Sequence, residues 1–120
     1  MIVEGLVTAS SANANGNVGI LALTVRDSST VNNVSDGIVL DGRGGVGTGN
    51  TSSFNGGRGM NVQNGTAIGN TITRNGNFGI SARCPAVVAM NSIINNGGGV
   101  SIDTSSGGGG CILSNNATLP

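Results

Sequence analysis

The 120-residue sequence predicts an all-β solenoid, because one short pattern recurs along it at nearly constant spacing. In the stretch 70–80, Asn75 stands four residues before Gly79, and an apolar residue follows that glycine. The pattern recurs at steps of 18 to 22 residues. Its asparagines are Asn15, Asn33, Asn55, Asn75 and Asn95, and Asn115 lies where a sixth copy would begin. A period near 20 residues indicates that each repeat forms one coil.

A short strand is expected directly after each of these glycines. Apolar residues alternate there with period two, as Ile80 and Ala82 do, and side chains two positions apart share one face of a strand. We expect the following residues to point into the core: Ile20, Ile38, Leu40, Met60, Val62, Ile80, Val100 and Ile102. Joints rich in Gly and Asn, such as residues 42–49, indicate turns or protruding loops between strands.

Two or three short strands per repeat predict a right-handed parallel β-helix of about five to six coils of roughly 20 residues, forming a single domain over residues 1–120. A residue at a fixed point of each coil lies above its counterpart in the next coil. Asparagine side chains can then hydrogen-bond along the stack, so we expect the recurring asparagines to form a ladder at one edge. The glycine four residues later is expected to supply a corner with positive φ.

The composition agrees with a solenoid. Only 8% of residues are charged, 23 are glycines, and Phe54 and Phe78 are the sole aromatic residues. A solenoid needs only a slim core of aliphatic side chains. Disorder would also account for much Gly, Asn and Ser, but a disordered chain does not hold a fixed register. A β-sandwich also has many short strands, but it does not require this spacing.

The same composition limits the classes of partner. The net charge is zero and there is no Lys or His, so no basic surface or stacking aromatic residues are expected for nucleic acid. No apolar run approaches the roughly 20 residues of a membrane span. No signal peptide is visible before residues 2–7, and the first repeat lacks a cap. Either the protein is cytosolic or this chain is a piece of a longer one, and we expect it to be part of a longer β-helix.

The pattern Gly-Asn-Thr-Ile-x-x-Asn-Gly-x-x-Gly-Ile at Gly69–Ile80 resembles the repeats of right-handed parallel β-helix proteins, the superfamily that includes pectate lyases, polygalacturonases and alginate epimerases. The ending, Cys84–Pro120, is similar to the C-terminal coils of bacterial members of that superfamily. Many members act on acidic polysaccharides. The resemblance therefore implies a polysaccharide partner and an extracellular or cell-surface location.

The acidic residues do not form a catalytic pair in this prediction. Glycoside hydrolysis uses two carboxyl groups about 5–10 Å apart. Asp41 and Asp103 are expected at the same point of coils about 14 Å apart, and Asp36 and Asp41 flank one strand. Lyase chemistry uses carboxylates clustered around a calcium ion. We expect no catalytic residue, cofactor or metal in this chain. The alternative is that it is part of a polysaccharide lyase, hydrolase or epimerase.

Charged residues are instead expected on two outward columns, one four residues after the recurring glycines and one, with Asp36 and Arg58, just before them. One interpretation is that Arg83 with Asp103, and Asp36 with Arg58, form ion pairs between coils. The other is a shallow groove that hydrogen-bonds a glycan. Its candidate residues are Asp41, Arg43, Arg58, Arg83 and Asp103. The sequence therefore indicates a structural or glycan-associated solenoid.

Two further features concern the ends of the solenoid. Cys84 and Cys111 lie in adjacent coils, which predicts either a disulfide in an oxidising compartment or two free thiols. Leu21 and Val39 are expected to point outward on the first coils, where the strand edges are also open. We expect this surface to contact either a missing N-terminal region or a second copy of the chain.

Overall fold

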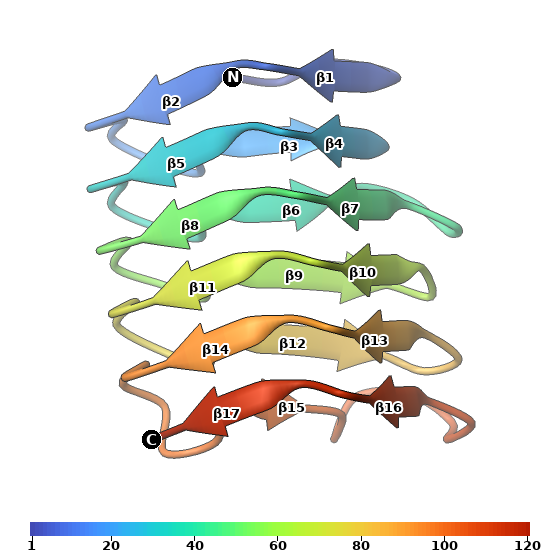
Figure 1. Ribbon diagram of the computed structural model, residues 1–120. Coiled ribbons are helices and arrows are strands. Elements are labelled where there is room, and N and C mark those ends of the chain that lie inside the picture. The colour runs from blue at the N-terminus through green and yellow to red at the C-terminus, as the bar shows by residue number, and fades with distance from the viewer.

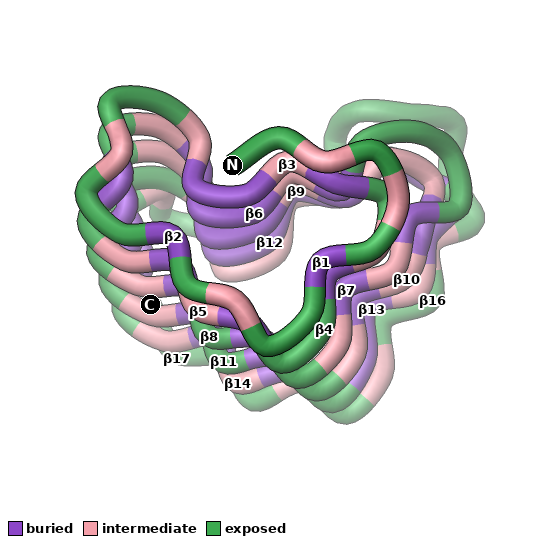
Figure 2. The backbone as a smooth tube through the Cα atoms, turned by 90° about the horizontal axis from the view of Figure 1, so that it is seen from above, coloured by how far each residue is buried: buried purple, intermediate pink, exposed green.

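The computed structural model describes all 120 residues, and it is a parallel β-solenoid of about five turns without any helix (Figure 1). Each complete turn contributes one strand to each of three parallel sheets, named A, B and C below. Seen from the N-terminal end, the chain runs clockwise from β1 through β2 to β3 as the coils recede, so the solenoid is right-handed (Figure 2). The predicted fold class is confirmed.

The strands are short and occupy equivalent positions in successive coils. Sheet A contains β3 (Ile20–Ala22), β6 (Ile38–Leu40), β9 (Met60–Gln63), β12 (Ile80–Arg83) and β15 (Ile102–Asp103). Sheet B contains β1 (Leu6–Thr8), β4 (Thr24–Arg26), β7 (Val46–Thr48), β10 (Thr66–Ile68), β13 (Val87–Ala89) and β16 (Ile112–Ser114). Sheet C contains β2 (Ser11–Asn13), β5 (Ser29–Val31), β8 (Thr51–Ser53), β11 (Thr71–Thr73), β14 (Ser92–Ile94) and β17 (Ala117–Leu119).

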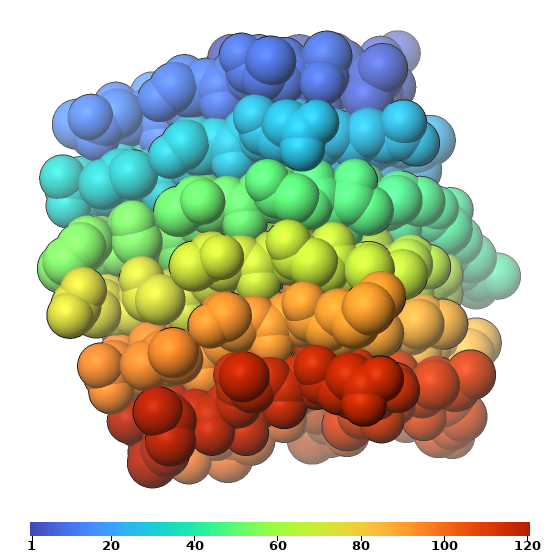
Figure 3. All heavy atoms as spheres, viewed as in Figure 1, coloured from blue at the N-terminus to red at the C-terminus, as the bar shows by residue number.

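The core is a narrow column that follows from this register. Ile80 in β12 pairs with Met60 on one side and Ile102 on the other, so apolar side chains stack coil upon coil. The predicted core residues from β3 to β12 are buried. The purple segments of the tube at β6 and β12 show buried strands of sheet A (Figure 2). Val88 in sheet B and Ile93 in sheet C close the column from the other two sides. Figure 3 shows the coils as successive layers of one molecule.

The prediction for Val100 is wrong, because its side chain is 51% exposed. Ser101, not Gly99, stands in the position of Gly79: the N–H of Ile80 donates to the carbonyl of Ser101, just as the N–H of Met60 donates to that of Gly79. Ile102 is therefore the first residue of its strand, and it is half-buried against the core. The segment between β14 and β15 has seven residues, whereas the earlier equivalents have six.

Four of the five recurring glycines serve close packing, and the prediction of positive φ is wrong for these four; Gly99 alone has positive φ, at 74°. Gly19, Gly37, Gly59 and Gly79 are not among the residues with positive φ. A Cβ atom on Gly59 would lie 2.7 Å from Nδ2 of Asn75 and still closer to Cγ2 of Ile72. Only a residue without a side chain fits there.

The left-handed corners between sheets C and A are made by the residues just before the asparagine ladder. These residues are Ala14, Asn32, Phe54, Arg74 and Asn95, with φ between 54° and 59°. Each one turns the chain after a strand of sheet C. The next residue then points its side chain along the stack, where it can bond to the coils above and below.

The asparagine ladder is present, with one change of member. The N–H and side-chain amide of Asn75 both donate to Oδ1 of Asn96, at 3.0 and 2.9 Å. The prediction of Asn95 is wrong because Asn95 occupies the left-handed corner and is exposed. The ladder consists of Asn15, Asn33, Asn55, Asn75 and Asn96.

A second ladder, which the sequence analysis missed, stands at the corner between sheets B and C. Its asparagines are Asn50, Asn70, Asn91 and Asn116, and Ser28 and Ser10 continue it towards the N-terminus. Asn115 therefore does not begin a sixth copy of the first pattern; it is the left-handed corner residue before Asn116. The repeated Gly-Asn-Thr at residues 49–51 and 69–71 is the signal that could have revealed this ladder.

Candidate ligand-binding groove at a variable corner

One corner of the solenoid varies in length, and the other two hardly do. Two residues separate each strand of sheet B from the next strand of sheet C, and six or seven residues lead from sheet C to sheet A. From sheet A to sheet B the connection ranges from the single residue Leu23 to the eight residues 104–111. This corner projects from the coils in Figure 2. Loops that vary on a rigid scaffold are common sites of binding.

A surface groove lies against this corner, and we call it the corner groove. Five polar side chains line it: Asp41, Arg43, Gln63, Asn64 and Arg83. These residues, with Val39 and Gly42, line a hollow of about 380 Å³. A neighbouring hollow of about 320 Å³ shares Arg43, Asn64 and Arg83 and is bounded on its other side by residues 107–108. Both hollows are open to solvent, so they can receive a segment of a polymer from the side.

The sheet positions most of these side chains directly. Asp41 follows the last residue of β6, while Gln63 and Arg83 end β9 and β12 and stand opposite each other in register. The side-chain amide of Asn64 donates to the carbonyl oxygens of Arg83 and Cys84, at 3.2 and 2.9 Å. These bonds fix the corner that follows β9.

Arg43 is carried by the inserted loop 41–45, which is tied to the next coil. The N–H of Gly44 donates to the carbonyl of Asn64 at 3.0 Å. Gly42 and Gly44 both have positive φ, which allows the loop to fold back onto the corner. As a result Arg43 and Arg83 border the same hollow although they lie two coils apart.

Arg43 and Arg83 are exposed, and neither forms an ion pair. Two other arginines already have partners. Arg58 pairs with Asp36 at 2.9 Å, and the guanidinium of Arg74 lies 5.6 Å from the ring centre of Phe54. The corner groove thus presents two available guanidinium groups beside one carboxylate, Asp41. A guanidinium group binds carboxylate, sulfate or phosphate oxygens through paired N–H groups.

The structure brings together Asp41, Arg43 and Arg83 but leaves the other two candidate residues elsewhere. Arg58 precedes β9, at the opposite end of that strand from Gln63, and its N–H also donates to Asp36 at 2.7 Å. The predicted Asp36–Arg58 ion pair is confirmed.

Asp103 also lies outside the corner groove, and the predicted ion pair between Arg83 and Asp103 is wrong. Asp103 pairs with Ser81, two positions before Arg83, and accepts a hydrogen bond from the N–H of Ser105 at 3.1 Å. Asp41 and Asp103 therefore do not occupy the same point of their coils. Two groove residues, Gln63 and Asn64, are not among the candidates predicted from the sequence. The signal for Asn64 is the Asn-Gly dipeptide at 64–65, which marks a turn after a strand.

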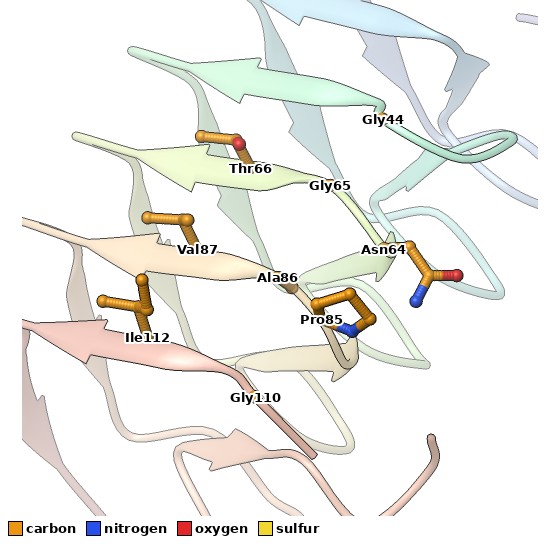
Figure 4. A pocket seen from close by; sticks show the side chains of 9 residues that line it. All are labelled: Gly44, Asn64, Gly65, Thr66, Pro85, Ala86, Val87, Gly110 and Ile112. Atoms are coloured by element: carbon orange, nitrogen blue, oxygen red, sulfur yellow. The ribbon is translucent and has the colours of Figure 1, made fainter. Parts of the chain in front are cut away.

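A more apolar hollow of about 300 Å³ adjoins the corner groove on the outside of sheet B (Figure 4). The side chains of Pro85, Val87 and Ile112 lie along it, with Asn64 at its edge. Asn64 and Pro85 also line the hollow of about 320 Å³, so the two hollows are neighbours at this corner. Together they offer charged, amide and apolar contacts side by side.

A disulfide between Cys84 and Cys111 supports this end of the groove. The two Cα atoms are 5.0 Å apart, and the bond connects the corner after β12 to the residue before β16. Gly107 also forms a β-bridge with Cys84, so the longest connection is fastened at two points to the coil before it. Of the two alternatives that the sequence left open, a disulfide or two free thiols, the structure has the disulfide.

Comparison with known proteins leaves the architecture as the only basis for classification. No protein-family model matches the chain, and no curated protein or solved structure is significantly similar to it. The chain belongs to the class of parallel β-solenoids with internal asparagine ladders.

The chain contains no group of three or more His, Cys, Asp or Glu residues that could hold a metal ion. None of its elements is a helix able to cross a membrane.

Proposed function

We propose that this chain is the structural, glycan-associated solenoid of a secreted or cell-surface protein and that its corner groove binds an acidic polysaccharide without chemical change. The observation that carries the proposal is that Arg43 and Arg83 border one hollow and that neither forms an ion pair. A uronate carboxylate fits between two guanidinium groups. Asp41, Gln63 and Asn64 supply acceptors and donors for sugar hydroxyl groups.

Different observations support the proposed family and the proposed location. We assign the chain to the pectate-lyase-like superfamily on the repeat at Gly69–Ile80 and the right-handed coil, and to its bacterial members on the segment Cys84–Pro120. A disulfide is stable in an oxidising compartment, which favours an extracellular location.

The geometry supports weak binding at each site. Both arginines are exposed, and an ion pair at an exposed position contributes about 0–1 kcal/mol. We expect a dissociation constant for a short acidic oligosaccharide of about 1 mM. A polysaccharide that contacts several molecules at once binds more tightly, because each further contact is made at high effective concentration.

The test is a titration with oligogalacturonate, followed by NMR chemical shifts and compared with neutral galactan oligomers. We expect shifts at Asn64 and its neighbours with the acidic oligomers only. The double variant Arg43→Gln/Arg83→Gln should abolish them. The matched control is Arg26→Gln, since Arg26 is an exposed arginine on sheet B that lines neither hollow.

Two results would contradict the proposal. Equal binding of the neutral oligomers, or unchanged binding by the double variant, would show that the two arginines do not recognise an acidic glycan. Release of product from pectin, alginate or hyaluronan that disappears in Asp41→Ala would establish a lyase, hydrolase or epimerase activity instead.

A further inference from the structure

The apolar hollow on the outside of sheet B and the corner groove share one side chain, that of Asn64. Asn64 lines this hollow of about 300 Å³ and also both hollows that Arg43 and Arg83 border. Figure 4 shows it at the edge of the apolar hollow, beside Pro85. A ligand that the two arginines hold can therefore extend past Asn64 into the apolar hollow.

The side chain of Asn64 presents an acceptor to such a ligand. Its amide nitrogen already donates twice, to the carbonyl oxygens of Arg83 and Cys84 at 3.2 and 2.9 Å. These two bonds also fix which atom of the amide is nitrogen, because a carbonyl oxygen accepts from N–H only. Oδ1 of Asn64 accepts no hydrogen bond from the chain. The group left over at this edge therefore suits a ligand that brings an N–H.

Two main-chain N–H groups along the hollow are unused donors. Gly65 and Ala86 both line the hollow and are buried, and neither N–H has a hydrogen-bond partner in the protein. The residue after each of them is paired: the N–H of Thr66 donates to the carbonyl of Gly45 at 2.8 Å, and the N–H of Val87 donates to that of Gly65 at 2.9 Å. A buried donor without a partner favours a ligand that brings an acceptor.

The outer wall of the hollow is apolar. Val87 and Ile112 pair in register between β13 and β16, so their side chains lie next to each other along the hollow (Figure 4). Ile112 is 59% exposed, and Pro85 at the edge is exposed as well. A methyl group placed against these side chains is removed from water, which is favourable.

We propose that this hollow binds the N-acetyl group of an amino sugar, so that the ligand of the corner groove is a glycan in which uronate and N-acetylhexosamine units alternate. The inference rests on the proposed function, because the uronate carboxylate lies between Arg43 and Arg83. The neighbouring N-acetylhexosamine then lies at Asn64, whose Oδ1 accepts from the N–H of the acetamido group.

The rest of the acetamido group has its own contacts. Its carbonyl oxygen accepts from the N–H of Gly65 or Ala86, and its methyl group packs on Val87 and Ile112. An acetamido group is a sugar substituent that combines a donor, an acceptor and a methyl group. A hydroxyl group lacks the methyl group, and an O-acetyl ester lacks the donor, so neither matches all three kinds of contact.

The test is an NMR titration of the full chain with three oligosaccharides. A hyaluronan tetrasaccharide carries carboxylates and N-acetyl groups, digalacturonate carries the same number of carboxylates alone, and chitotetraose carries N-acetyl groups alone. We expect the hyaluronan tetrasaccharide to bind about tenfold more tightly than digalacturonate, through the added hydrogen bonds and the buried methyl group. Chitotetraose should bind more weakly than either. The main-chain amides of Gly65 and Ala86 should shift further with the hyaluronan tetrasaccharide than with digalacturonate.

The double variant Val87→Thr/Ile112→Thr separates recognition of the acetamido group from recognition of the carboxylate. Threonine keeps the branched shape that suits a strand and makes the wall of the hollow polar. The variant should therefore lose the preference for the hyaluronan tetrasaccharide and bind digalacturonate as before. The matched control is Ile68→Thr, since Ile68 is half-buried in β10 of the same sheet and lines none of these hollows. It should keep the preference.

The outcomes distinguish this inference from the proposed function. Equal affinity for the hyaluronan tetrasaccharide and digalacturonate, with both lost in Arg43→Gln/Arg83→Gln, would overturn the N-acetyl site alone. A preference that persists in Val87→Thr/Ile112→Thr would do the same, as would equal affinity for an O-acetylated digalacturonate, since an ester has no N–H. Binding of neither acidic ligand would overturn both proposals. So would chitotetraose binding as tightly as the hyaluronan tetrasaccharide with no effect of the arginine variant.

Discussion

The side-chain oxygen Oδ1 of Asn75 accepts two hydrogen bonds from Asn55, one from its main-chain N–H at 3.0 Å and one from its side-chain amide at 2.9 Å. Both residues are buried. The amide of Asn75 in turn donates to the carbonyl of Ser52 at 3.1 Å and to Oδ1 of Asn96. One side chain therefore links three successive coils at a point that water does not reach.

Replacing Asn75 with alanine should lower the free energy of unfolding by about 3 kcal/mol, because two buried donors of Asn55 lose their acceptor. Urea-induced unfolding followed by circular dichroism measures the change. The matched control is Asn13→Ala, since Asn13 is exposed and its side chain forms no hydrogen bond. A similar loss in both variants would show that the ladder is not the source of stability.

The Asn95–Asn96 pair shows how far the repeat pattern can predict structure. Asparagine suits a left-handed corner as well as a ladder. The residue type therefore does not indicate which of the two asparagines forms the corner and which joins the ladder. Counting back four residues from Gly99 selects Asn95. In the structure the ladder residue is Asn96, because Ser101 takes the position of the recurring glycine. The segment between β14 and β15 is one residue longer than its equivalents in the earlier coils.

The two asparagines should therefore respond differently to substitution. Asn95→Gly should change stability by less than about 0.5 kcal/mol, since glycine adopts the φ of 59° without steric cost. Asn96→Ala should cost at least about 1.5 kcal/mol, because both donors of Asn75 lose their acceptor. Thermal unfolding of the two variants side by side gives the comparison. The opposite order would place Asn95 in the ladder.

The sequence was sufficient to predict the coils but only some of the residues that line the groove. Strand positions repeat, so residues such as Ile38 and Met60 can be aligned by counting. The corner groove depends on connections whose lengths differ from coil to coil. Arg43 reaches the hollow that Arg83 lines only because the inserted loop folds back onto Asn64. The spacing of residues in the sequence does not indicate that this loop folds back.

Removing the disulfide should destabilise the last coils. The double variant Cys84→Ser/Cys111→Ser opens a loop with a sequence separation of 27 residues, and the chain-entropy model gives a loss of about 3–4 kcal/mol. Denaturant unfolding with and without a reducing agent measures it. The wild-type protein should be less stable with the reducing agent, and the stability of the double variant should not change.

Mass spectrometry of non-reduced protein should show a peptide pair that lacks two hydrogen atoms and joins Cys84 to Cys111. Free thiols in the native protein would contradict the pairing.

The recurring glycines offer a test of close packing that does not involve backbone strain. Gly59 and Gly16 both lack positive φ, so an added methyl group tests only the space around them. At Gly59 the methyl group meets Ile72 and the ladder residue Asn75, and neither can move without disturbing the core. We expect Gly59→Ala to cost about 1–3 kcal/mol. At Gly16 nothing lies within 4 Å, so Gly16→Ala should leave stability unchanged or raise it by about 0.5 kcal/mol through the smaller entropy of the unfolded chain. Urea unfolding of the two variants measures the difference, and equal effects would mean that the coils are not in direct contact at Gly59.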